Sequence, residues 1–172
     1  MPELSVLISE DAVITGDCTI GVKTVIFPQV QIRASAEGRV VIGERNILEE
    51  KCEVQDSSLE HANVLSVGCS VNRCSIGSFN TIGLACRLEG CTLGNLCIVA
   101  AGVCMKDVTL GDNSSVFLSP LGQGWSAVVL PSESLKLQHE TNAAYHTAVS
   151  EPISPQFAGR HLKLRAQGKV ES

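Results

Sequence analysis

Three cysteines, Cys52, Cys69 and Cys86, follow one another at intervals of seventeen residues. Thiolates at a regular spacing could bind a metal ion or form a redox centre. However, the chain contains no CxxC pair, and buried cysteine commonly behaves as a small hydrophobic residue. We therefore predict stacked thiols in a core rather than a metal site. Cys74 and Cys91 share the interval and are predicted to lie at a corner.

Histidine could supply zinc ligands or a general base. Only His61 lies within the first 120 residues, whereas His139, His146 and His161 come later. Three histidine ligands cannot be assembled from one imidazole. His61 follows the aliphatic residue Leu59 by two positions, and its side chain is predicted to face solvent. We therefore expect no catalytic, metal-binding or cofactor-binding residue in this region, and no enzymatic activity.

Asparagine forms a second column with the same interval, Asn46, Asn63 and Asn80. Such a column could bind a ligand, but side-chain amides that hydrogen-bond from one repeat to the next explain it more simply. Glycines follow several aliphatic residues without forming a GxGxxG or P-loop motif, so the sequence gives no indication of a phosphate-binding loop.

These residues belong to a repeat that appears when the chain is shifted against itself by seventeen residues. Three aliphatic positions, separated by six, six and five residues, recur in each repeat, and neither a helical period nor strand alternation maintains that register. Before residue 34 the spacing is six, and the segment 34–39 (ASAEGR) is an insertion. The three columns are Ile42, Leu59, Ile76, Leu93 and Leu110; Leu48, Leu65, Ile82, Val99 and Val116; and Val54, Val71, Leu88 and Met105.

The fourth residue after each aliphatic position is small or compact, which predicts one large and one small inward side chain on each side of a three-sided coil. The small columns are Thr24, Asn46, Asn63, Asn80, Cys97 and Ser114; Ala12, Val30, Cys52, Cys69, Cys86 and Val103; and Cys18, Ala36, Ser58, Ser75, Thr92 and Thr109. Coils stacked at a strand spacing of about 4.8 Å would form a parallel β-helix. The fold class predicted is thus an all-β solenoid.

Domain organisation follows from where the repeat stops. Residues 1–120 are predicted to form the β-helix, and residues 121–172 a linker, an α-helix and a polar tail. The helix is indicated by an apolar stripe after Pro131, formed by Leu137, Ala144, Tyr145 and Ala148. It would pack along the side of the prism or on another subunit.

Composition excludes several partners. The net charge of −5 and the scattered basic residues give no footprint for nucleic acid. The chain has neither a signal-peptide pattern nor an apolar run of about 18 residues that would span a membrane. We therefore expect a cytoplasmic protein that does not insert into membranes.

The repeat resembles the left-handed β-helix family of hexapeptide repeats, in segments such as IGVKT, IGERN, LEEKC, IGSFN, IGLAC and LGDNS. Within that family, the run VVIGERNILEEKCEV, the following NVLSVGCSV and the predicted helix are similar to the hexapeptide-repeat subunits of dynactin. The resemblance implies a left-handed helix and a structural subunit of the pointed-end complex at the cytoskeleton. The partners it implies are the other hexapeptide-repeat subunit, the actin-related protein and, indirectly, dynein adaptors.

Two other members of the family remain as alternatives. A relative of γ-class carbonic anhydrase would share the fold and the C-terminal helix, but the zinc-ligating histidines are missing, so such a relative should be inactive. A hexapeptide acyltransferase would be a homotrimer with substrate clefts between subunits. Zinc content and acetyl-CoA turnover distinguish these alternatives from an assembly subunit.

Overall fold

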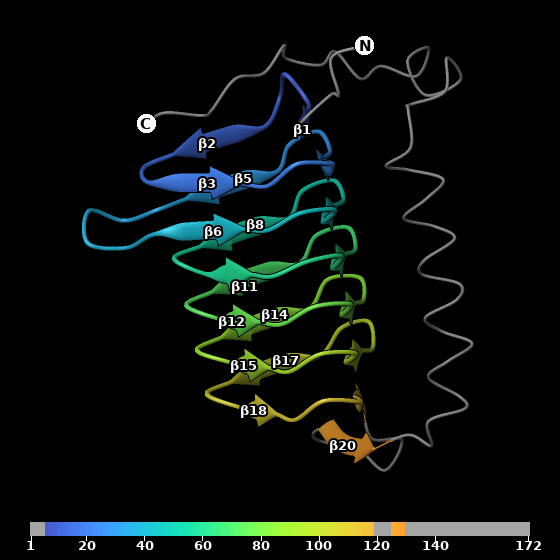
Figure 1. Cartoon of the computed structure of the whole chain (residues 1–172). Helices are drawn as coiled ribbons and strands as arrows, with labels where there is room; N and C mark the ends of the chain where they lie inside the picture. Colours follow the sequence, from blue (N-terminus) through green and yellow to red (C-terminus); the bar gives the residue numbers. More distant parts are fainter. Residues whose placement is uncertain (1–5, 119–124, 130–172) are drawn as a thin grey trace, which may run out of the picture.

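The computed structural model describes residues 6–118 and 125–129. In this part of the chain, short strands stack into three parallel sheets that form the sides of a prism (Figure 1). The chain passes once through each sheet in every coil, for about seven coils, and the coils wind in the left-handed sense (Figure 1). The predicted solenoid and its handedness are confirmed.

Each sheet is named here after its first strand. The β1 sheet contains β1 (Val6–Ile8), β4 (Thr24–Ile26), β7 (Ile47–Leu48), β10 (Val64–Leu65), β13 (Thr81–Ile82), β16 (Ile98–Val99), β19 (Ser114–Leu118) and β20 (Trp125–Val129). The β2 sheet contains β2 (Val13–Thr15), β5 (Gln31–Arg33), β8 (Glu53–Gln55), β11 (Ser70–Asn72), β14 (Arg87–Glu89) and β17 (Cys104–Lys106). The β3 sheet contains β3 (Cys18–Ile20), β6 (Val40–Ile42), β9 (Ser58–Leu59), β12 (Ser75–Ile76), β15 (Thr92–Leu93) and β18 (Thr109–Leu110).

The strand register reproduces the seventeen-residue interval. Leu65 pairs with Ile82, and Ile82 pairs with Val99. The large aliphatic residues of the three predicted columns are buried, with exposed fractions of at most 6%. They form one continuous core along the axis of the prism. The six, six and five spacing therefore identified the inward positions of the large residues correctly.

On the third side, the small companion was predicted correctly in the first coil, where Cys18 is buried, but one residue too late in the coils after the insertion. Ser58, Ser75, Thr92 and Thr109 are exposed, and Ala36 lies in the exposed insertion. The inward small residues on this side include Ser57, Cys74 and Cys91, each directly before the residue predicted. The reason is geometric: this side has five residues instead of six, so three positions rather than four separate the large and small inward residues. Cys74 and Cys91 are thus core residues and not corner residues.

The corners of the prism require left-handed backbone conformations. Twelve described residues other than glycine have positive φ, among them Ala62, Phe79 and Leu96, which follow one another at one corner with φ between 56° and 63°. Such conformations cost roughly 1–2 kcal/mol each for L-amino acids. Hydrogen bonds between coils offset this cost, because the amides of ten of these residues donate to a carbonyl of the coil before, as Phe79 N–H does to His61 O at 2.9 Å.

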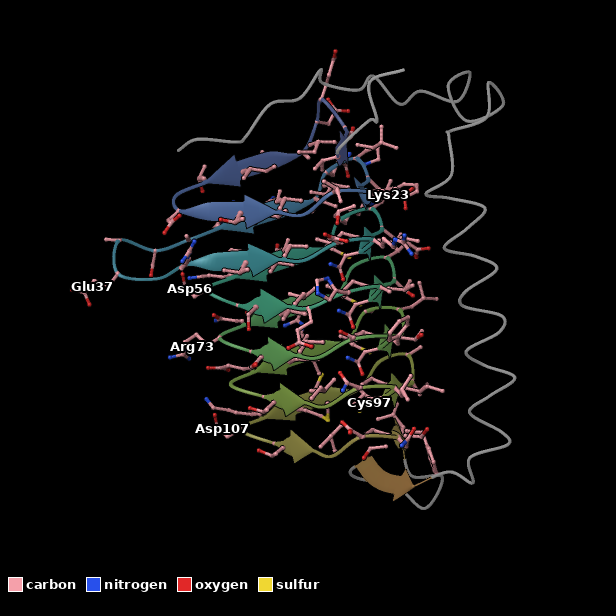
Figure 2. All side chains as sticks on the ribbon, viewed as in Figure 1. Lys23, Glu37, Asp56, Arg73, Cys97 and Asp107 are labelled. Atoms are coloured by element: carbon pink, nitrogen blue, oxygen red, sulfur yellow. The ribbon has the colours of Figure 1, made fainter. Side chains whose placement is uncertain are left out.

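The insertion at residues 34–39 protrudes from the prism between β5 and β6 (Figure 1). Figure 2 shows Glu37 in this loop and Asp56 at the corner beside it. The Ser35 amide donates to Asp56 Oδ1 at 2.8 Å, and this hydrogen bond lowers the pKa of Asp56. Arg39 forms an exposed ion pair with Asp17 at 3.5 Å. The loop is therefore anchored at both of its ends.

Two features of the β1 sheet were not predicted. Its outer face carries a buried apolar row, Leu7, Val25, Ile47 and Val64, so both faces of this part of the sheet are buried. In addition, β20 pairs antiparallel with β19, where the sequence suggested a linker.

The helix predicted after Pro131 and the polar tail lie outside the described residues. No helix long and apolar enough to cross a membrane occurs among residues 6–118 and 125–129.

Substitution of Ile82 by Asp tests the register. Ile82 is completely buried, and an unpaired carboxylate in this narrow core should lower the free energy of unfolding by at least about 3 kcal/mol. Ser75→Asp is the matched control because Ser75 is exposed on a neighbouring side, and it should change stability by less than about 0.5 kcal/mol. Urea unfolding measures both. Equal midpoints for Ile82→Asp and wild type would show that the register is wrong.

Candidate functional site

The asparagine column is a hydrogen-bonded ladder inside the prism. The amide and the Nδ2 of Asn63 both donate to Asn46 Oδ1, at 2.9 and 3.0 Å. Asn80 makes the same two contacts with Asn63 Oδ1. Nδ2 of Asn63 also donates to Gly77 O at 2.8 Å. The three side chains are buried and hydrogen-bonded to one another, so the ladder stabilises the stack, as predicted.

The cysteine column also links neighbouring coils of the β-helix. Cys52, Cys69 and Cys86 are completely buried, and each thiol donates to a carbonyl oxygen of the next coil at 3.1, 2.8 and 3.0 Å, respectively. Among the described residues, no group of three or more His, Cys, Asp or Glu side chains could hold a metal ion. The seven buried cysteines and the exposed Cys104 are all free thiols.

The environment of the column opposes ionisation of its thiols. Interaction with the Cys52 thiol, supported by burial, raises the pKa of Cys69 to about 12. The Cys69 thiol likewise raises the pKa of Cys86, and burial raises the pKa of Cys74 to about 11. Because the thiolate is the reactive form of cysteine, these residues are unsuited to act as nucleophiles.

His61 lies at a corner, within a second and more exposed ladder. Its Nδ1 accepts a hydrogen bond from the Glu44 amide at 3.0 Å, and its own amide donates to Ser78 Oγ at 3.2 Å. The pattern continues in the next two coils. Asn95 Oδ1 accepts a hydrogen bond from the Ser78 amide, and Asp112 Oδ1 accepts one from the Asn95 amide, each at 2.7 Å. A neutral imidazole that accepts at Nδ1 carries its proton on Nε2. In this arrangement the exposed nitrogen is a donor, and His61 would have to change tautomer to act as a base there.

A shallow hollow of about 170 Å³ lies on the outer face of the β2 sheet, over β5, β8 and β11. It is smaller than the pockets of about 300–1,000 Å³ that usually bind small molecules. Asn72 Oδ1 in its lining is enclosed and accepts no hydrogen bond. No histidine among residues 6–118 and 125–129 lines this hollow. The lining residues are Gln31, Arg33, Glu53, Val54, Gln55, Ser70, Val71 and Asn72.

Comparison with solved structures finds this fold in hexapeptide transferases. No protein-family model matches the chain, and no curated protein matches it. Among solved structures, it is similar to a hexapeptide transferase family protein from Anaplasma phagocytophilum, with 14% identity, a TM-score of 0.66 and coverage of 86% of this chain and 96% of that one.

Two further structures are enzymes by name. The acetyltransferase domain of PglB from Neisseria gonorrhoeae, in complex with acetyl coenzyme A, has 22% identity and a TM-score of 0.61 over 73% of this chain. This chain spans only 58% of the length of that protein. The UDP-N-acetylglucosamine acyltransferase LpxA from Bacteroides fragilis has 17% identity and a TM-score of 0.53, with 82% and 68% of the two chains covered. The fold is that of the hexapeptide-repeat β-helix.

The comparisons correct one expectation from the sequence. A protein without enzymatic activity was expected, but structures that share the fold are acetyltransferases and acyltransferases. The expectation was wrong because it relied on histidine counts within a single chain. The comparisons favour the acyltransferase alternative over the dynactin role.

Removal of one asparagine side chain from the buried ladder should lower the free energy of unfolding more than removal of an exposed asparagine side chain. Asn63→Ala leaves the Asn80 amide and its Nδ2 without their acceptor inside the core, and should lower the free energy of unfolding by about 3 kcal/mol. Asn95→Ala removes one exposed contact and should cost less than about 1 kcal/mol. Urea unfolding compares them, and equal losses would contradict a structural role for the buried ladder.

Alkaline pH should destabilise the protein through the buried thiols. The unfolded chain ionises Cys69 near its ordinary pKa of 9.0, whereas the folded chain holds the proton until about 12. The folded state therefore binds more protons in this window, and its stability falls as pH rises above about 9. Urea unfolding at pH 7 to 10.5 measures the slope. Cys69→Ala should reduce the slope and Cys104→Ala should not; identical slopes in all three proteins would count against this account.

Proposed function

We propose that this chain is an assembly subunit that joins other proteins through the outer surface of its β-helix. Its sequence resemblance to the hexapeptide-repeat subunits of dynactin makes dynactin subunit 6 the specific candidate. In that role the chain would belong to the pointed-end complex, in the cytoplasm and at the cytoskeleton. Its partners would be the second hexapeptide-repeat subunit and the actin-related protein, and it would support dynein adaptors indirectly.

An exposed apolar ridge on one corner carries the proposal. Val67, Leu84, Ala101 and Leu118 follow one another at the coil interval of seventeen residues. Leu84 and Leu118 are 53% and 52% exposed. The corner is continuous, because Ala85 N–H donates to Val67 O at 3.0 Å and Gly102 N–H donates to Leu84 O at 2.8 Å.

Contiguous exposed apolar surface is a mark of interaction sites in soluble proteins. The ridge differs from singly exposed apolar residues because Val67, Leu84 and Ala101 occupy the same corner position in successive coils. Leu118 extends the row at the end of β19, where it pairs with Trp125 of β20. The hydrogen bonds between these coils hold the ridge rigid, so little ordering entropy would be lost when a partner binds it. A straight, preorganised apolar edge is therefore suited to packing against another protein.

Charge substitution on the ridge tests this role. The double variant Leu84→Glu/Leu118→Glu should lose most of its co-elution with dynactin pointed-end components, because two carboxylates would be buried without partners at the interface. Val41→Glu is the control, since Val41 is 37% exposed on the β3 sheet, away from the ridge. Gel filtration with mass spectrometry of the tagged proteins gives the result. Unchanged co-elution of the double variant would refute the ridge as the contact surface.

Acyl transfer is the second candidate function, and the fold comparisons favour it. The PglB domain binds acetyl coenzyme A, and an equivalent reaction here would transfer an acyl group from a coenzyme A thioester to an acceptor. His61 is the imidazole available among the described residues. Turnover of acetyl-CoA by the purified protein that His61→Gln abolishes would support an enzyme. Turnover that is absent with a panel of amine acceptors would weigh against this candidate.

A further inference from the structure

We infer that the first coil is the end at which the second hexapeptide-repeat subunit docks, by adding strands in register to β2 and β3. This inference rests on the proposed assembly role and specifies which end of the prism takes part. It follows from three observations: the direction of the free backbone groups, the exposure of the core at the two ends, and the position of β20.

The backbone of the first coil presents hydrogen-bonding groups outward. β2 and β3 are terminal strands of their sheets, and no described residue pairs with their outer sides. The Val13 amide donates inward to Val30 O at 2.9 Å, and Thr15 O accepts from the Ala34 amide at 2.8 Å. Because backbone groups alternate along a strand, the N–H and C=O of Ile14 point away from the second coil. In β3, the Gly21 amide donates to Ile42 O at 2.7 Å. By the same alternation, the N–H and C=O of the neighbouring Ile20 point away from the second coil.

The core is also less covered at this end. Ile14 and Ile20 occupy the inward aliphatic columns but remain partly exposed. Their counterparts in the last coil, Met105 and Leu110, are only 3% and 6% exposed. An edge that combines unpaired strands with exposed core side chains is a template for strand addition. The first coil has this combination, and the last coil does not.

The position of β20 argues against a second copy of this chain as the occupant. β20 runs antiparallel to β19 at the far end of the β1 sheet, so one of the three sheets cannot continue there as a parallel stack. Head-to-tail stacking of copies is blocked at that sheet. The corner of the first coil before β2 carries the acidic residues Glu10 and Asp11, whereas Asp17 at the next corner is ion-paired with Arg39. The occupant is therefore a different β-helix with basic residues facing the Glu10–Asp11 corner, since complementary charge fixes partner and register.

Amide hydrogen exchange on the reconstituted pair of full-length subunits tests the inference. Complex formation should slow exchange of the Ile14 and Ile20 amides by at least tenfold. The Lys106 and Thr109 amides, on the last strands of the same two sheets, should not change. Protection at Lys106 and Thr109 instead would overturn the inference and leave the assembly role intact. Failure of the two subunits to form a complex would overturn both.

A charge variant provides an independent readout. Asp11→Lys places a positive charge on the exposed rim of the first coil and should weaken the complex about tenfold, as measured by titration calorimetry. Asp107→Lys, at an exposed corner of the last coil (Figure 2), is the matched control and should bind like wild type. The opposite ranking, or equal affinities for the two variants, would contradict docking at the first coil.

Discussion

In-register stacking of the coils is the constraint on which the rest of this structure depends. After the insertion, each inward residue lies next to its equivalents seventeen residues earlier and later, so each column must hold side chains that pack against or hydrogen-bond to the neighbouring coils. Aliphatic residues satisfy this by contact, asparagines by amide-to-amide hydrogen bonds and cysteines by donation to the next coil's carbonyls. The left-handed corners are tolerated because the same stacking satisfies their backbone groups.

This constraint separates the structural residues from those available for function. The residues that first suggested chemistry, the cysteine and asparagine columns, are buried and hydrogen-bonded within the stack. His61 is exposed, but its Nδ1 is held by the Glu44 amide. Among the described residues, the features that remain for function lie on the outer surface: the apolar ridge, the anchored loop at residues 34–39 and the first coil, where no described strand pairs with the outer sides of β2 and β3. The surface is where both a protein partner and a neighbouring catalytic subunit would make contact.

The sequence predicts the fold well because its period records the stacking directly. The aliphatic columns, the asparagine ladder and the buried thiols all follow from a residue recurring every seventeen positions. The third small column was misplaced because the sequence period does not reveal which corner lacks a residue. Likewise, β20 has no counterpart in the repeat, and the buried outer row led by Leu7 and Val25 looks like ordinary strand alternation. The expectation of no enzymatic activity failed for a different reason, since it relied on counting histidines, and a histidine count does not decide whether this fold belongs to an enzyme.

The assembly role is the central claim, and the composition of the native particle tests it most directly. The tagged full-length protein would be purified from its native cytosol at moderate salt, and its mass and co-eluting chains determined by gel filtration and mass spectrometry. The account predicts a heteromeric particle that contains dynactin pointed-end components. A homotrimer of this chain alone that turns over acetyl-CoA would contradict it and establish the acyltransferase in its place.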